Sequence, residues 1–206
     1  MAEKKKFMDV QAPLLNKNIE VLGTPAELKN KTIKLDLTRK LKGKGLNVTF
    51  QIIDSNNNLF AVPKKMELNS SYIRKIMRKR VDYVEDSFIT NCKDVSIIIK
   101  PFLITRKKVS RAVRRKLREV TKEFLIEYVK EKNYVDVCQD LFNSQLQKQM
   151  LPKLKKVYPL AFCDLRILET KKINELTFLG LEVNEDEDDE GEDYIKIKDE
   201  DDEGEE

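Results

Sequence analysis

The last 22 residues hold almost no apolar side chains, and this limits where the chain can build a core. Residues 185–206 contain 15 Asp and Glu and only 2 Lys, and the sequence DEDDEGE occurs there twice, at Asp186–Glu192 and Asp199–Glu205. Such a segment repels itself and buries too little to offset the entropy of ordering its backbone. We therefore predict a folded domain at 1–184 followed by a disordered acidic tail at 185–206.

The remaining 184 residues are strongly basic. They hold 38 Lys and Arg against 21 Asp and Glu, so this body carries +17 while the tail carries −13. A body of this charge needs a polyanionic partner or tolerates one as a neighbour, and nucleic acid is the usual candidate. No run approaches the roughly 18 consecutive apolar residues of a membrane-spanning helix, so we expect no membrane partner.

Catalytic and metal-binding residues are scarce. The chain has no histidine, which removes the Ser-His-Asp and Cys-His schemes and the commonest metal ligand. The three cysteines lie far apart without metal-ligand spacing, and we expect buried or half-buried thiols. An RNA-processing enzyme with a carboxylate-bound metal would have to use Glu85, Asp86 and Asp94, but a strand edge or turn explains these acids more simply. We predict no enzyme activity and no cofactor.

Periodicity predicts the first half of the fold. Apolar residues alternate with polar ones at 33–37 and 46–52, as they do in half-buried strands. The turn-forming run 54–58 and the apolar run 59–62 complete a hairpin. Asn69 or Ser70 can cap a short helix that runs to about residue 80.

The second half alternates between strands and helices. A second hairpin is predicted from 84–90 and 95–105, and Pro101 indicates an edge strand or a bulge there. A helical region follows at 106–132, then shorter helices at 136–157, where Pro152 predicts a kink or a fresh start, and a last strand at 160–168. This order predicts an α+β fold, an antiparallel β-barrel-like core packed by helices.

The helical region after residue 106 carries the strongest functional signal. At about 100° per residue, its cations fall on one side, opposite an apolar stripe. The cationic side holds Arg111, Arg114, Arg115, Arg118 and Lys122, with Arg106, Lys107 and Lys108 at its approach. Most charged helix faces are simply solvated, but those usually interleave signs, and like charges at these spacings cost energy unless a partner supplies anions. Arginine also suits bidentate phosphate contacts.

Two further basic segments are candidates for RNA contact. The shorter helix carries a second cluster: Arg74, Lys75, Arg78, Lys79 and Arg80. A solvated helix end, where cations suit the macrodipole, explains that cluster equally well. The N-terminal Lys4, Lys5 and Lys6 form a short basic arm. Aromatic interleaving is weak, which favours recognition of the backbone and shape of folded RNA.

Four segments, in order, resemble one family. They are Phe7–Pro13 (FMDVQAP), Glu67–Arg74 (ELNSSYIR), Lys100–Lys108 (KPFLITRKK) and Val157–Leu160 (VYPL). Their order and spacing resemble the eukaryotic and archaeal small-subunit ribosomal protein S-one family, also called S-three-A-e, from about residue 7 to 173. The N-terminal arm and the basic segment after Thr105 are shorter than is usual in that family, and the acidic tail is not a family feature.

The resemblance implies a β-barrel-like core with helices, bound to small-subunit rRNA. It also implies a place on the platform near the messenger exit, beside other small-subunit ribosomal proteins and the rRNA 3′ end, with messenger RNA as a further candidate partner. The expected location is cytoplasmic, in ribosomes, and nucleolar during assembly if the source is eukaryotic. An alternative from the charge pattern is a nucleic-acid or histone chaperone that acts through the acidic tail.

Overall fold

The computed structural model describes residues 5–41, 43–55 and 58–171. In these residues nine strands form one sheet, in the order β2-β1-β5-β9-β8-β6, with β3 and β4 attached through β5 and with β7 beside β8. The strands are β1 (Lys6–Ala12), β2 (Lys17–Gly23), β3 (Thr32–Asp36), β4 (Leu46–Ser55), β5 (Asn58–Leu68), β6 (Tyr83–Glu85), β7 (Phe88–Asn91), β8 (Ser96–Thr105) and β9 (Leu160–Thr170). The acidic tail predicted at 185–206 lies outside the described residues.

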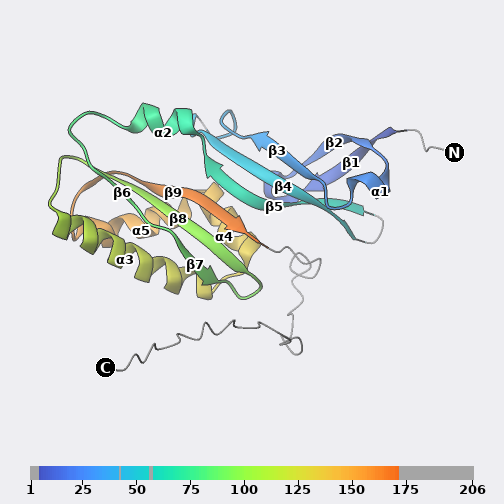
Figure 1. The fold of residues 1–206 in the computed structure, drawn as a ribbon. Coiled ribbons are helices and arrows are strands. Elements are labelled where there is room, and N and C mark those ends of the chain that lie inside the picture. Colours follow the sequence, from blue (N-terminus) through green and yellow to red (C-terminus); the bar gives the residue numbers. More distant parts are fainter. Residues whose placement is uncertain (1–4, 42, 56–57, 172–206) are drawn as a thin grey trace, which may run out of the picture.

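Five α-helices and one 3-10 helix complete the fold. They are η1 (Pro13–Leu15), α1 (Pro25–Leu28), α2 (Ser70–Ile76), α3 (Arg111–Lys130), α4 (Tyr134–Phe142) and α5 (Gln145–Lys155). Helices α3 to α5 lie along the strands β6 to β9, and α2 lies on the other side of these strands (Figure 1). The α+β class is thus confirmed. The sheet is mixed rather than wholly antiparallel, because β1 and β5 pair in parallel at Val10 and Leu59.

The long strand β5 joins two parts of the sheet. The predicted hairpin with β4 is confirmed, and β5 runs beyond it to Leu68. Its first residues pair with β1, and residues 65–67 pair with β9. The alternation that predicted β4 also orients it, because Val48, Phe50 and Ile52 are completely buried.

The second predicted hairpin is formed by β7 and β8. Strand β8 lies between β6 and β7 on one side and β9 on the other, so Pro101 is not on an edge strand. The alternative prediction of a bulge is confirmed, since the register with β9 shifts between Lys100 and Pro101. A bulge lets the sheet accommodate a residue that has no N–H to donate.

The helix boundaries differ from the predicted ones at three places. Asn69 caps α2 by accepting a hydrogen bond from the Ser71 N–H, but the helix ends at Ile76 rather than near residue 80. Helix α3 begins at Arg111 rather than at residue 106, because Ser110 caps it with its hydroxyl. Helix α5 continues through Pro152, so the predicted fresh start there is wrong, while the alternative of a kink stays a prediction. Its buried Leu146, Met150 and Leu154 anchor it on the core despite that residue.

The core contains the three cysteines, as expected from their sequence context. Cys92, Cys138 and Cys163 are free and buried, and burial raises the pKa of each thiol to about 12. They are therefore protonated and unreactive at neutral pH. Within the described part of the chain, no helix is both long and apolar enough to cross a membrane.

Candidate nucleic-acid interface

The two basic clusters meet at one end of the molecule. The segment that follows α2 and the loop between β8 and α3 come together at the left of Figure 1. Thr105, the last residue of β8, is completely buried between them. Its backbone N–H donates to the Asp82 carbonyl oxygen at 2.9 Å, and its hydroxyl accepts from the Asp82 N–H at 3.1 Å. The end of the first cluster is thus fixed against the start of the second.

The hydrogen bonds between Asp82 and Thr105, which we call the clamp, also hold the loop that carries the second cluster. The Thr105 hydroxyl lies 2.7 Å from the Lys107 carbonyl oxygen, to which it can donate. The Asp82 carboxylate accepts a hydrogen bond from the Val109 N–H at 2.9 Å. Both sides of the basic run 106–108 are therefore held by Thr105 and Asp82, and the three cationic side chains project from a fixed backbone.

We call the resulting surface the basic end. It consists of Arg74, Lys75, Arg78, Lys79, Arg80, Arg106, Lys107, Lys108 and Arg111, all exposed. Among the described residues, none of these nine side chains has a carboxylate within ion-pair distance. Nine clustered cations without internal counter-charges repel each other and attract polyanions.

The cationic side of α3 is less uniform than predicted. The Arg115 Nε donates to the Glu119 carboxylate at 2.9 Å, one turn away. Arg115 therefore has an opposite charge at the i,i+4 spacing. The Arg118 Nε donates to the Glu85 carbonyl oxygen at 3.1 Å, and the Lys122 ammonium lies 5.9 Å from the centre of the Phe88 ring.

These contacts arise because α3 packs against β6 and β7. The side of the helix that carries Arg118 and Lys122 therefore borders the sheet, instead of facing away from the protein. Arg114 is half-buried, and its Nε is buried without a hydrogen-bond partner in the protein. Of the five predicted helix cations, Arg111 is the one that joins the basic end.

The beginning of α3 adds to the positive field. Its first turn contains Arg111 and Arg114 and no acidic residue. Exposed N–H groups already give a helix N-terminus a partial positive charge, so cations there are unfavourable in the isolated protein. The same arrangement favours a bound anion such as phosphate.

A pocket of about 530 Å³ opens within the basic end. Its lining comes from Tyr72, Lys75 and Ile76 of α2, Arg78 and Val81 of the following segment, Ile104 of β8, Arg106 of the loop and Ala161 of β9. The glycine at position 45 keeps α2 close, because a Cβ there would lie 2.7 Å from the Tyr72 Cβ. The sequence did not reveal this pocket, because its residues come from three separate stretches of the chain, at 72–81, 104–106 and 161.

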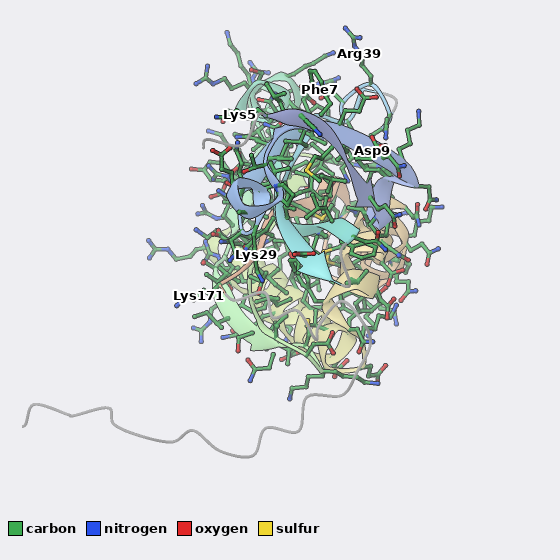
Figure 2. The ribbon with its side chains drawn as sticks, turned by 90° about the vertical axis from the view of Figure 1, so that its right-hand side faces the viewer. Lys5, Phe7, Asp9, Lys29, Arg39 and Lys171 are labelled. Atoms are coloured by element: carbon green, nitrogen blue, oxygen red, sulfur yellow. The ribbon has the colours of Figure 1, made fainter. Side chains whose placement is uncertain are left out.

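The N-terminal lysines lie elsewhere. Lys6 begins β1, and the Lys5 ammonium lies 3.6 Å from the Glu27 carboxylate. Figure 2 shows Lys5 and Phe7 at the β1 end of the molecule, and Figure 1 places that end opposite the basic end. Lys4 lies outside the described residues. Lys5 and Lys6 therefore do not form a free arm beside the other candidates.

Comparison with known proteins decides the family. Residues 1–173 match the model of the Ribosomal S3Ae family. The chain belongs to the Ribosomal S3Ae family. This agrees with the resemblance in its four sequence segments, and it places the chain in a family of structural ribosomal proteins rather than enzymes.

Similar proteins extend over most of this S3Ae chain. The small ribosomal subunit protein eS1 of Nanoarchaeum equitans is 24% identical over 192 residues, covering 81% of the chain and 92% of that protein. The protein of the same name from Desulfurococcus amylolyticus is 22% identical, covering 76% and 78%. That of Saccharolobus islandicus is 22% identical, covering 83% and 86%.

Two of the three acidic residues considered for metal-dependent catalysis in this S3Ae protein, Glu85 and Asp94, have structural partners. The Glu85 carboxylate accepts two hydrogen bonds from one Arg166 nitrogen, at 2.8 and 3.0 Å. Asp94 accepts from the Tyr134 N–H at the start of α4, at 3.3 Å, and burial raises the pKa of that carboxyl. In the described ranges, no three His, Cys, Asp or Glu residues group where they could hold a metal ion.

Proposed function

We propose that this protein is a structural component of the small ribosomal subunit and binds small-subunit rRNA through its basic end. One observation carries the proposal: the Asp82–Thr105 clamp joins two clusters into a surface of nine exposed cations. Among the described residues, none of these cations has a carboxylate within ion-pair distance. Family membership supplies the context, and the relatives that match are named small ribosomal subunit proteins.

The chemistry of the basic end favours contact with the RNA backbone. Five of its nine residues are arginines, whose planar guanidinium groups bind phosphate oxygens in pairs. Phosphate contacts position a protein without reading sequence. A surface held by a fixed clamp therefore recognises the spacing of phosphates, which depends on the shape of a folded RNA.

The proposal has finer parts that rest on the resemblance alone. The protein would lie on the platform near the messenger exit, in contact with neighbouring small-subunit proteins, the rRNA 3′ end and passing messenger RNA. It would work in cytoplasmic ribosomes and, in a eukaryote, pass through the nucleolus during assembly. Its RNA-binding domain would be residues 1–184, with 185–206 as a separate acidic tail.

The salt dependence of RNA binding tests the basic end. If about six phosphates are neutralised, the logarithm of affinity for single-stranded RNA should fall against log salt with a slope near −4. The variant Arg78→Gln/Arg106→Gln/Arg111→Gln should reduce the slope to about −2, since each lost contact removes roughly 0.7. Filter binding at several salt concentrations measures both slopes.

A matched control removes the same charge from another surface. Lys17, Lys31 and Lys40 are exposed and lie outside the basic end. Replacing all three with Gln should change the slope by less than about 0.5, because only direct phosphate contacts release counterions. Equal slopes for the two triple variants would contradict the assignment of RNA binding to the basic end.

Sedimentation tests the ribosomal assignment separately. Cell lysate is separated on a sucrose gradient at low and at moderate salt, and the protein is followed by immunoblot. A stoichiometric component of the small subunit should migrate with small subunits and whole ribosomes under both conditions. Recovery only in the light fractions would overturn the proposal and favour the chaperone alternative.

A further inference from the structure

The pocket in the basic end has apolar walls and a cationic rim. Ile104 is buried at its base, while Tyr72, Ile76 and Val81 are half-buried around it. The three charged lining residues, Lys75, Arg78 and Arg106, are all exposed. Its volume of about 530 Å³ falls in the range of small-molecule sites, roughly 300–1,000 Å³. The pocket can therefore enclose a group of about that size that is apolar at one end and anionic at the other.

A row of aromatic rings supports one wall. The Tyr72 ring meets Phe162 of β9 edge-on, with the ring centres 6.2 Å apart at 69°. Phe162 meets the buried Phe102 of β8 in the same way, at 6.2 Å and 63°. The contact with Phe162 restricts the orientation of the Tyr72 ring, which lines the pocket, and this limits the entropy lost on binding.

Among the residues that the structure describes, no carboxylate lines the pocket. The nearby Asp164, whose charge contributes to the raised pKa of Tyr72 after the larger effect of burial, is buried and ion-paired with Lys44 at 2.6 Å. Asp82 is engaged with the Val109 N–H. The charge at the pocket mouth is therefore positive, which favours an occupant that carries negative charge beside its apolar part.

We propose that this pocket binds an unpaired base of single-stranded RNA, stacked on Tyr72, with the adjoining phosphates against Lys75, Arg78 and Arg106. A nucleotide combines a flat apolar ring with an anionic backbone, and aromatic side chains bind such rings with little sequence preference. The inference rests on the proposed function in that RNA is the partner. It adds a contact that depends on bases to a surface otherwise described by phosphates.

Two probes of equal charge separate the base from the backbone. One is an RNA decamer of adenylates, and the other is a ribose-phosphate decamer of the same length without bases. Stacking of one base is worth roughly 5- to 150-fold in affinity, so the full-length protein should bind the adenylate decamer that much more tightly. Fluorescence anisotropy of end-labelled probes at fixed salt measures the ratio.

Three variants test whether the ratio of the affinities for the two decamers depends on the pocket. Tyr72→Leu should lower the ratio towards one, whereas Tyr72→Phe should preserve it, because both aromatic rings can stack. Ala161→Leu fills the pocket from an exposed strand position, removes no contact and adds no charge, so it should also lower the ratio. Thermal unfolding of each variant identifies any that fails to fold, and Ala161→Leu keeps the test decisive if Tyr72→Leu does.

The outcomes distinguish the pocket from the function. Loss of the ratio in folded Ala161→Leu, with binding of the decamer without bases unchanged, supports the pocket. If both decamers bind and no folded variant alters the ratio of their affinities, the pocket does not bind a base, although the phosphate-binding surface stands. The same result is expected if the pocket instead binds an apolar side chain of a neighbouring protein. Failure to bind either decamer would overturn the proposed binding of the RNA backbone by the basic end, on which this inference rests.

Discussion

Two parts of the molecule differ in how their positive charges are paired. In the part built from β1 to β5, Glu67 binds Lys34 and Lys65, each at 2.8 Å, and Glu27 lies near Lys5. At the basic end, nine exposed cations have no such partner among the described residues. Paired lysines add a little to the stability of the fold and need nothing further. Unpaired cations cost stability through repulsion and leave their charge available to a partner.

Breaking the clamp should have the largest effect. In Thr105→Val the side chain keeps its shape but loses the hydroxyl that bonds to Asp82 and Lys107. We expect the free energy of unfolding to fall by about 1–3 kcal/mol, because buried polar groups lose their partner. RNA affinity should also fall, since the loop 106–108 is no longer held. Urea titration and filter binding measure the two effects.

Thr90→Val provides the matched control. Thr90 is also buried in a strand, but it is not part of the clamp. The same substitution there should lower the free energy of unfolding by less than Thr105→Val does, and should leave RNA affinity unchanged. If both threonine variants behave alike, the clamp does not set the geometry of the basic end.

Removing the acidic tail should sharpen the contrast between these two parts of the molecule. Residues 185–206 carry −13 on a chain whose remaining residues carry +17, so a tail that screens the basic end would compete with RNA. Deletion of 185–206 should raise RNA affinity roughly three- to tenfold at low salt, and the gain should shrink as salt screens both charges. Loss of binding to basic client proteins, with unchanged RNA affinity, would instead favour the chaperone alternative.

A glycine at position 80 should change the stability of the protein and its RNA affinity in opposite directions. Its φ is 65°, in the left-handed region that side chains with a Cβ avoid. Arg80→Gly relieves this strain, less the entropy that glycine loses on folding, and should stabilise the protein by up to about 1 kcal/mol. RNA affinity should fall modestly because one cation is lost. Arg80→Lys, which keeps both the charge and the strain, should change neither quantity much.

The smallest expected effect on stability concerns Glu67, which is paired with Lys34 and Lys65. Hydrogen bonds from Lys34 and then Lys65 hold the pKa of Glu67 below its ordinary value. A lowered pKa contributes stability that is present above the unfolded-state pKa and is lost as the pH falls through the folded-state pKa. Relative to Glu67→Gln, the wild type should therefore lose stability below about pH 4.3, by less than about 1 kcal/mol, because the pair is partly exposed. Thermal unfolding from pH 6 to pH 3 measures this difference.

The sequence predicted those elements whose signal is local. The alternation at 46–52 and the turn at 54–58 were sufficient for the β4–β5 hairpin, and Asn69 is one of the two residues expected to cap α2. The early start predicted for α3 was wrong because Ser110, rather than the preceding charges, fixes where that helix begins. The parallel pairing of β1 with β5 joins segments about fifty residues apart, and periodicity carries no information on such a contact.

The candidate site shows the same division. Each basic cluster could be recognised in the sequence. The two clusters come together, however, through hydrogen bonds made by Asp82, just before β6, and Thr105, at the end of β8. The sequence indicated weak aromatic interleaving. The rings of Tyr72, Phe162 and Phe102 nevertheless form a row, because α2, β9 and β8 bring them together from ninety residues of chain. The hydrogen bond from Arg118 to the Glu85 carbonyl oxygen could not be predicted either, because the two residues lie 33 positions apart in the sequence.

The triple pairing of β5 has a consequence for the order of folding. Strands β1 to β5 pair only with one another, until residues 65–67 of β5 meet β9. Strand β8 also needs β9 along most of its length. During synthesis from the N-terminus, the first five strands can therefore assemble early. The pairing of β8 with β9 follows only when residues 160–170 have been synthesised. The pocket of the basic end, which Ala161 of β9 lines, can therefore be completed only after this last described strand has been synthesised.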